Sequence, residues 1–410
     1  MPEGTDVVAA HLAAIERLES HVHAYVYVDR TAHGSEGPLA GTTVAVKDNL
    51  PVAGMPWTDG SAAWRDRIAD HDDPSVARLR SAGAAILGKT NLPELAAAIG
   101  TTNAIFPATN NPWRDGITPG GSTGGSAAAV AAGMATFGLG TDMGGSIRIP
   151  ASCCGVAGLR PSVNRVPTDI IDAAGLSVTA PLARTVSDLR EAFGVMVDEE
   201  PRLDFSSPRK RIGVAFETAL GLDPACRDAC RRAADALEKA GHVLKRIEWE
   251  SEAVAEGYGI VRRASMASFP ATLEKFGPAI RGLVEQGRKL SALDFFTAYE
   301  RAAALAQRVV NAPLVADFDF LLTPTLGLPP MAIEAVPPFL SEPYRGYVQF
   351  VLPVSFAKVP AISIPAGLHD GLPVGVQLVG RFAQEWSLLD LAEELEQMDG
   401  FGFREPEGVR

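Results

Sequence analysis

The sequence predicts an α/β fold, in which helices pack on a layered β-sheet. Short apolar segments typical of strands alternate with longer segments typical of helices along most of the chain. Glycine-rich turns separate several of these segments. At 410 residues the chain is long enough for one large domain or two of ordinary size.

The N-terminal part of the chain shows this alternation clearly. The expected elements are a helix over 1–21, strands at 23–29 and 41–50, a helix from 75 to 83 and a strand at 84–87. Lys47 closes the apolar part of the second strand, and Val44 and Val46 share one of its faces. A glycine-rich loop at 118–126 then leads into an alanine-rich helix.

The remainder of the chain repeats the pattern with a helical insertion. A strand opens into a second glycine-rich turn within 136–159, and an irregular charged connection is expected at 190–208. A strand at 211–217, a helix at 223–241 and a strand at 243–249 follow. The last part is expected to contain a mainly helical region at 251–347 with a proline-rich break at 322–338, strands at 359–365 and 371–380, and a closing helix. The pattern contains no internal repeat.

Composition indicates a soluble cytoplasmic protein. Apolar residues make up 47% of the chain and charged residues 21%. The formal net charge of −12 argues against nucleic acid or an anionic membrane as partner. The first 21 residues lack the basic and continuously apolar regions of a signal peptide, and the weakly polar run at 126–139 is too short to span a bilayer. Four cysteines do not form a disulfide framework at this length, and we expect reduced thiols at Cys153, Cys154, Cys226 and Cys230.

The two glycine-rich loops do not match phosphate-binding motifs. The loop from Gly120 to Ser126 lacks the lysine that follows the last glycine of a P-loop. In the second loop, Gly138, Gly140 and Gly144 are one residue out of step with G-x-G-x-x-G. An alternative for the first loop is that it caps the helix that follows.

The second loop is better suited to a nucleophile. Ser146 follows Gly144 and Gly145 in a turn whose N–H groups could converge on an oxyanion. A serine nucleophile needs a base, but the chain has no histidine between His71 and His242. This weakens a Ser-His-Asp triad without excluding it, since a distant histidine could fold back. Neither an H-E-x-x-H nor a C-x-x-C metal motif is present.

Lysine is the other candidate base. Lys47 and Lys89 are the only lysines before residue 210, and each lies at the end of a short apolar strand. Burial can lower a lysine pKa until the neutral amine serves as a base, although a solvated charge at a strand end is the simpler interpretation. Asp48 should point to the opposite side of the strand from Lys47. The residues alone do not choose between the two lysines.

Several sequence blocks together resemble the amidase signature family. The central blocks are "GGSTGGSAAAVAAG" and "GTDMGGSIRIPASCCGVAGLRPS". Upstream blocks are "GPLAGTTVAVKDNLPVAG", "DDPSVARLRSAGAAILGKTNLPELA" and "NNPW", and downstream blocks are "FDFLLTPTL", "VPAISIPAG" and "GLPVGVQLVG". The similarity extends over nearly the whole chain. Departures from the family pattern, at Thr123 and Asn164, touch none of the family's catalytic positions.

The resemblance implies a Ser-Ser-Lys catalytic group. Lys47 would be the base, Ser122 a relay at a cis peptide bond, and Ser146 the nucleophile. Ser122 and Ser146 have the family's spacing of 24 positions, and Lys89 falls in a block that is not catalytic in the family. The oxyanion would be held by N–H groups at Met143, Gly144, Gly145 and Ser146. Neither a metal nor an organic cofactor is implied.

The resemblance also implies the architecture and the activity. A single domain over 1–410 would contain a central mixed sheet with helices on both faces, a signature core at 41–190 and a variable substrate-pocket region at 251–347. The expected activity is hydrolysis of a small carboxamide to a carboxylate and ammonia or an amine through a seryl acyl-enzyme. The alternatives are an A-type glutaminase subunit of a tRNA-dependent amidotransferase and a non-catalytic ligand-binding protein. A homodimer is a further possibility, and Arg148 could contact a substrate carboxylate or be structural.

Overall fold

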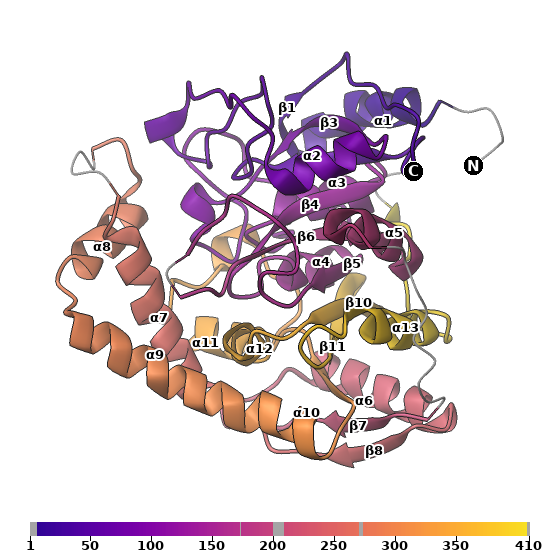
Figure 1. Ribbon diagram of the computed structural model, residues 1–410, viewed down its shortest axis with the longest axis vertical. Coiled ribbons are helices and arrows are strands. Elements are labelled where there is room, and N and C mark those ends of the chain that lie inside the picture. The colour runs from indigo at the N-terminus through magenta and orange to yellow at the C-terminus, as the bar shows by residue number, and fades with distance from the viewer. Residues whose placement is uncertain (1–5, 173, 200–208, 270–273, 408–410) are drawn as a thin grey trace.

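The computed structural model describes residues 6–172, 174–199, 209–269 and 274–407. Among these residues, eleven strands form one continuous sheet (Figure 1). The strands are β1 (Tyr25–Val28), β2 (Thr43–Lys47), β3 (Ala85–Thr90), β4 (Phe137–Asp142), β5 (Ala157–Arg160), β6 (Val178–Ala183), β7 (Arg211–Val214), β8 (Val243–Arg246), β9 (Phe320–Pro324), β10 (Ala361–His369) and β11 (Leu372–Val379). Their order across the sheet is β1-β3-β2-β4-β6-β5-β10-β11-β9-β7-β8.

The sheet is mixed, as expected. β2 runs parallel to β3 and β4, and β7 runs parallel to β8 and β9. Between these two parallel groups, β6, β5, β10 and β11 are joined by antiparallel pairs. The antiparallel β1–β3 pair forms one edge of the sheet. The predicted α/β class and mixed sheet are therefore confirmed.

Helices cover both faces of the sheet. They are α1 (Val7–Val22), α2 (Pro74–Ser81), α3 (Gly124–Ala131), α4 (Arg148–Cys154), α5 (Val186–Val197), α6 (Pro224–Lys239), α7 (Glu252–Met266), α8 (Pro278–Gly287), α9 (Ala292–Ala306), α10 (Ala312–Ala316), α11 (Glu342–Val348), α12 (Val351–Ala357) and α13 (Glu385–Glu396). In β2, Val44 and Val46 pack in one apolar core with side chains of α2, α5 and α13, whereas Ala45 packs in a second core with α1 and α3. Every residue of β2 is buried, because successive side chains point to opposite covered faces.

The region from 251 to 347 combines a helical layer with a strand of the sheet. α7, α8 and α9 lie together on one side of the molecule, on the side away from α1 (Figure 1). The strand β9 lies inside this region of the sequence and pairs with β7 and β11 within the sheet. The proline-rich break therefore begins after the strand, near Pro324, instead of at residue 322.

The prediction of an irregular connection at 190–208 is wrong for residues 190–197, which are helical. The helix α5 continues to Val197, and Leu189, Phe193 and Met196 on this helix are buried. Their spacing places these apolar side chains on one helical face, which packs in the core and outweighs the charged residues between them. Residues 200–208 lie outside the described part of the chain.

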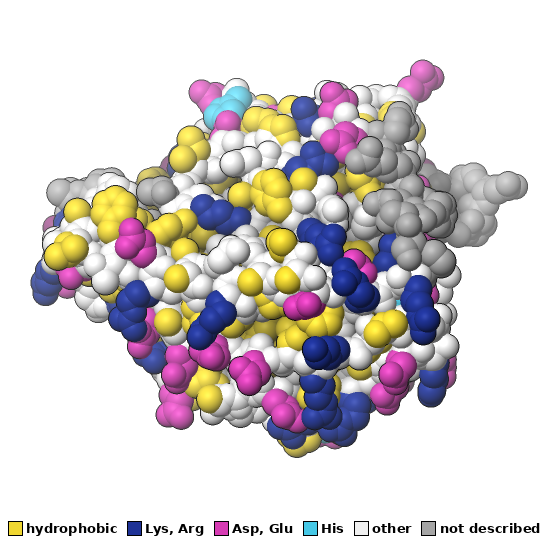
Figure 2. Space-filling view, turned by 60° about the horizontal axis from the view of Figure 1, so that its bottom comes forward, with side chains coloured by type: hydrophobic (Ala, Val, Ile, Leu, Met, Phe, Trp, Pro, Cys, Tyr) yellow, Lys and Arg dark blue, Asp and Glu magenta, His cyan; other side chains and the backbone are white. Residues whose placement is uncertain are grey.

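The surface and the thiols agree with the composition. On the face shown in Figure 2, Lys and Arg side chains lie interspersed with Asp and Glu side chains. The four cysteines are buried and unpaired, as expected for reduced thiols. Within the described ranges, none of the helices has the length and the apolar character needed to cross a membrane.

Candidate active site

Lys47 lies at the carboxyl end of β2, between the parallel neighbours β3 and β4. Its side chain has no exposed surface. Nζ donates hydrogen bonds to Ser122 Oγ at 2.7 Å and to Thr141 Oγ1 at 3.0 Å. Both partners are hydroxyl groups, which can accept from an amine and can also donate to its lone pair. This arrangement suits a lysine that changes between its charged and neutral forms.

Lys89, in β3, has different surroundings. Its Nζ donates to Asp48 Oδ1 at 2.9 Å, to the Leu50 carbonyl at 2.7 Å and to the Pro56 carbonyl at 2.9 Å. Three acceptors, one of them a carboxylate, satisfy the three N–H groups of an ammonium. Asp48 is thus engaged by Lys89, in agreement with the expectation that it points away from Lys47. The surroundings distinguish a buried ion pair at Lys89 from a hydroxyl-bonded amine at Lys47.

Burial also changes the pKa of Lys47. Desolvation lowers this pKa to about 7, because the ammonium form is penalised in the interior. The charges of Asp59 and Asp142 oppose this effect, and that of Arg262 adds to it. Near pH 7, a large fraction of Lys47 is therefore neutral.

Ser122 lies in the glycine-rich loop before α3, and its side chain is fully buried. The Gly121–Ser122 peptide bond is cis. The loop packs tightly, since a Cβ atom at Gly121 would lie 2.8 Å from the Gly100 carbonyl oxygen. Thr123 is the N-cap residue of α3 and makes no side-chain capping bond, so side-chain capping is not the role of this loop. The loop instead places the Ser122 hydroxyl beside Lys47.

Ser146 lies in the turn between β4 and α4, and it is half-buried. The turn is organised by Asp142, whose carboxylate accepts from the N–H groups of Gly145 at 2.8 Å and Ile147 at 3.3 Å. Burial alone would raise the pKa of Asp142, but Arg148 and Arg160 hold it well below its usual range. The Ser146 carbonyl accepts from the Thr123 N–H at 3.2 Å, which joins the two glycine-rich loops.

The four residues expected to hold an oxyanion do not have equivalent N–H groups. The Gly145 N–H donates to Asp142 Oδ1, so the expectation that Gly145 provides a free N–H group for the oxyanion is wrong. In the part of the chain that the structure describes, the N–H groups of Met143, Gly144 and Ser146 have no hydrogen-bond acceptor. Gly145 has a φ of 110°, and a Cβ atom at Gly144 would lie 2.8 Å from the Tyr258 ring. Both glycines are therefore required by the shape of the turn.

Arg148 is structural. Its side chain is fully buried, and Nε and Nη2 form a two-point contact with the Asp142 carboxylate at 2.9 and 3.0 Å. The remaining donors bond to Gln377 Oε1, the Val351 carbonyl and Ser355 Oγ. A substrate carboxylate has no access to this guanidinium.

A cavity of about 590 Å³ brings the expected serines together. Ser122, Ser146 and Met143 line it, and Lys47 reaches it through the hydrogen bond to Ser122. The other lining residues are Asn49, Asp59, Leu95, Ala96, Thr141, Ile170, Ile171, Asp172, Ala174, Ser177, Tyr258, Val261, Arg262, Ala264, Ser265, Met266, Ser268, Phe269 and Phe295. The helix α7 forms one wall, so the helical region contributes directly to the site.

Sequence reasoning missed several polar residues of this cavity. Thr141 Oγ1 accepts from both Lys47 Nζ and Asn49 Nδ2, each at 3.0 Å. Asp59 and Arg262 bring charges of opposite sign to the walls. Thr141 and Asn49 could have been found from the sequence, because Thr141 lies in the block that contains Ser146 and Asn49 lies in the block that contains Lys47. For Asp59 and Arg262 the sequence carries no comparable signal, because each comes from a segment distant from both serines.

No histidine is among the residues that line the cavity within the described chain. His242 Nε2 lies 3.1 Å from Glu394 Oε1, and His71 lies on the surface between Asp70 and Asp169. The Ser-His-Asp alternative therefore has no histidine at the cavity.

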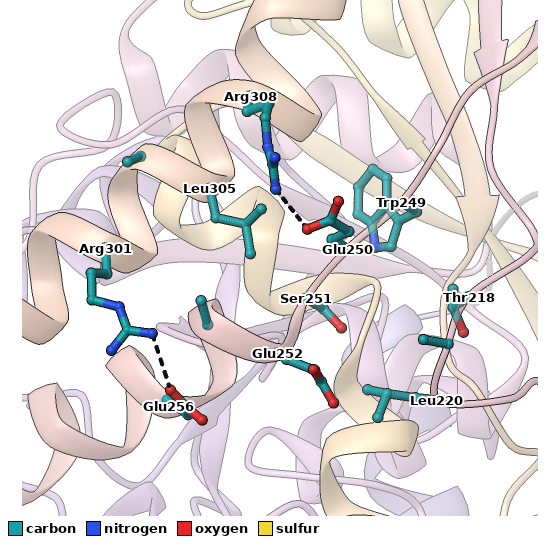
Figure 3. Close-up of a pocket in the computed structure, with 13 residues that line it drawn as sticks. Thr218, Leu220, Trp249, Glu250, Ser251, Glu252, Glu256, Arg301, Leu305 and Arg308 are labelled. Atoms are coloured by element: carbon teal, nitrogen blue, oxygen red, sulfur yellow. Dashed lines mark hydrogen bonds and ion pairs between the residues drawn. The ribbon is translucent and has the colours of Figure 1, made fainter.

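A second hollow, of about 760 Å³, lies between α7, α9 and the segment after β7 (Figure 3). Its arginines face glutamates, with Arg308 Nη2 at 2.6 Å from Glu250 Oε2 and Arg301 Nη2 at 4.0 Å from Glu256 Oε2. None of the expected catalytic residues lines this hollow within the described chain. The nucleophile and base chemistry is thus concentrated in the cavity that contains Ser122 and Ser146.

Comparison with known proteins identifies relatives along the whole chain. The family model for amidases matches residues 7–389. The A-type subunit of the glutamyl-tRNA(Gln) amidotransferase from Synechococcus sp. (strain CC9311) is 33% identical, over 97% of this chain and 94% of the relative. The corresponding protein of the same name from Roseiflexus castenholzii is 32% identical, over 99% of this chain and 94% of the relative.

Solved structures with a similar fold include a hydrolase as well as an amidotransferase subunit. A 6-aminohexanoate cyclic dimer hydrolase, solved in complex with its substrate, superimposes with a TM-score of 0.87 at 27% identity, over 98% of this chain and 95% of the other. The A-type subunit of the Thermotoga maritima glutamyl-tRNA(Gln) amidotransferase gives a TM-score of 0.83 at 28% identity, over 99% and 94% of the two chains. The protein belongs to the amidase signature family, and it is an enzyme acting on carbon–nitrogen bonds other than peptide bonds.

Proposed function

We propose that this enzyme hydrolyses the C–N bond of a small carboxamide through an acyl intermediate on Ser146. The observation that carries the proposal is the buried Lys47–Ser122 hydrogen bond of 2.7 Å in a cavity that also contains Ser146. A serine needs a base to become a nucleophile, and a neutral lysine amine can provide one.

In the proposed reaction, the Ser146 hydroxyl attacks the amide carbonyl and passes its proton to Ser122. Ser122 at the same time gives its own proton to the neutral amine of Lys47. Thr141 Oγ1 accepts a hydrogen bond from Lys47, and this contact helps to orient the lone pair of the neutral Nζ toward Ser122. The developing oxyanion accepts from the N–H groups of Gly144 and Ser146, with Met143 as a further donor.

Collapse of this tetrahedral intermediate breaks the C–N bond. The leaving nitrogen takes the proton back from Lys47 through Ser122, and ammonia or an amine departs. Water then attacks the ester carbonyl on Ser146, using the same relay as its base, and releases the carboxylate. The overall reaction consumes one amide and one water, and it needs neither a metal nor an organic cofactor.

A second candidate function is the A-type glutaminase subunit of a tRNA-dependent amidotransferase. The identity of 33% with relatives of that name favours it. Such a protein would deliver ammonia from glutamine to a companion chain. The superposition on 6-aminohexanoate cyclic dimer hydrolase, with a TM-score of 0.87, favours hydrolysis of a small amide.

The test is ammonia or amine release by the purified chain, without other proteins, from a panel of monoamides, diamides, ureas and aryl amides together with glutamine. Turnover of a small amide by the chain alone supports the proposal. Turnover of glutamine only, increased by a co-purifying partner protein, would favour the second candidate. Absence of turnover with every amide, combined with absence of fluorophosphonate labelling, would contradict both.

A further inference from the structure

The cavity contains two acceptor groups without a donor. Asp59 lines the cavity, and its carboxylate has neither a hydrogen bond nor an ion pair with any residue in the described ranges. Asn49 Nδ2 bonds to Thr141, and its buried Oδ1 has no donor among the described residues. A buried acceptor without a donor, such as Asn49 Oδ1, is uncommon in proteins because it carries a cost of desolvation, whereas Asp59 is half-buried at the cavity wall. Such groups suit a ligand that supplies N–H donors.

Asp59 is held close to the proposed reaction centre by its backbone. Its N–H donates to the carbonyl of Asp48 at 3.2 Å, and Asp48 directly follows Lys47 in the chain. Its own carbonyl accepts from the Leu95 N–H at 2.8 Å. Asp172, the second carboxylate among the described residues that line the cavity, is already occupied by the N–H groups of Leu176 and Ser177. Asp59 is therefore the carboxylate that remains available to a ligand.

From this arrangement we infer that the substrate is an amide that carries an ammonium group, and that Asp59 binds this group. The inference rests on the proposed function and names its substrate class. The ammonium would form a charge-assisted hydrogen bond with Asp59 while the amide carbonyl lies at Ser146. Asn49 Oδ1 can accept a further N–H of the same substrate.

The effect of neighbouring charges on the pKa of Lys47 favours a cationic substrate over an anionic one. Among the charges that act on Lys47, Asp59 has the largest effect and raises its pKa, which opposes the neutral form needed in a base. A cation bound at Asp59 cancels this effect. An anion bound at Arg262 would cancel the cationic charge that lowers the pKa of Lys47, and would therefore hinder the reaction.

The carboxylate is charged under ordinary assay conditions. Burial raises the pKa of Asp59 to about 6, so that at pH 8 the group is ionised. Arg67 opposes this rise, but its guanidinium lies over the Trp57 ring at 3.8 Å and its Nε donates to the Trp57 carbonyl. The charged groups that interact electrostatically with Asp59 are Lys47, Asp48, Arg67, Lys89 and Arg262.

The test compares ω-amino amides with alkyl amides of the same length, for example 5-aminopentanamide with hexanamide, for chains of about three to five carbons. The two members of a pair differ by an ammonium in place of a methyl group. At pH 8 we expect kcat/KM for the best ω-amino amide to exceed that of its alkyl partner by about tenfold or more. Asp59→Asn should remove this preference, so that the two members of each pair are hydrolysed with similar kcat/KM. The matched control Asp172→Asn should retain the preference.

Three results would overturn the inference: equal turnover of the paired amides by the unmodified enzyme, a preference that survives in Asp59→Asn, or a stronger preference for an amide with a terminal carboxylate. Titration calorimetry of the same pairs with the Ser146→Ala variant measures binding without turnover. If the enzyme hydrolyses none of the amides, the proposed function fails, and the calorimetric preference for the ω-amino member then decides the inference on its own. Equal binding, or no binding of either member, would overturn it.

Discussion

The pH dependence of kcat/KM tests the proposed base directly. Because the pKa of Lys47 is lowered to about 7, activity on a neutral amide should rise through an ionisation near pH 7 and then reach a plateau. The sign follows from the proton transfer: below the pKa, Lys47 is an ammonium and has no lone pair to accept the Ser122 proton. At pH 7.5 about three quarters of Lys47 would be neutral, against about 0.1% of a lysine with its ordinary pKa. Burial thus increases the active fraction several hundredfold.

The Asp59→Asn variant shows whether this ionisation belongs to Lys47 or to Asp59. Asp59 is the largest of the charges that raise the pKa of Lys47, so its removal should shift the inflection to lower pH. The direction of the shift, toward lower pH, is the result that identifies Lys47 as the titrating group. The pKa of Asp59 is itself raised to about 6, and its ionisation could also produce an acid limb. If it did, the limb would disappear in the variant instead of moving.

The assay is the initial rate of ammonia release from hexanamide, at concentrations well below KM, between about pH 5 and about pH 10. Hexanamide carries no charge in this range, so the profile reports groups of the free enzyme. Asp172→Asn is the matched control, because Asp172 is not among the charges that act on Lys47, and its profile should be unchanged. A kcat/KM that climbs tenfold per pH unit up to about pH 10 would refute the lowered pKa. Disappearance of the limb in Asp59→Asn would refute its assignment to Lys47.

Further substitutions test the other members of the site. Ser146→Ala should abolish turnover without changing the melting temperature, and mass spectrometry should find the fluorophosphonate adduct of the unmodified enzyme on Ser146; an adduct on another serine would contradict the assignment. Lys47→Ala should lower kcat/KM by about 10²–10⁴-fold. Lys89→Ala should instead lower the free energy of unfolding by about 3–5 kcal/mol, since it leaves the buried Asp48 carboxylate without its cation; similar activity losses at equal stability would argue against this division of roles. Thr141→Val should reduce kcat by about tenfold or more, whereas Thr141→Ser should retain most of it, because only the serine keeps the acceptor for Lys47.

The parts of the fold with local signals were predictable from the sequence. The apolar run that ends at Lys47 predicted a strand, and β2 closes at this residue. Both glycine-rich segments lead into helices, α3 and α4, although the sequence indicated only the first helix. The charged residues around Arg190 suggested a connection, but the helix continues because its buried face is apolar. Local composition was misleading where tertiary packing decided the outcome.

The candidate site was predictable where its residues lie in contiguous blocks. Lys47, Ser122 and Ser146 each belong to a recognisable block, and Ser122 and Ser146 line one cavity. The hydrogen bond between Asp142 and the Gly145 N–H could not be read from the sequence, because it depends on the folded shape of the turn. Asp59 and Arg262 were missed for a similar reason, since only the packing of α7 against the N-terminal segments places them in the same cavity.

The contrast between the two buried lysines explains how one strand end can hold a neutral base in a protein rich in acidic groups. Asp48 immediately follows Lys47, yet its charge is paired with Lys89 and does not appear among the charges that act on Lys47. Asp142 does act on Lys47, but Arg148 and Arg160 contact its carboxylate at 2.9 and 3.0 Å. Asp59 differs from both, because its carboxylate has no hydrogen-bonded cation among the described residues, although the charges of Arg67 and Arg262 act on it. This carboxylate faces the cavity, where a substrate can neutralise it.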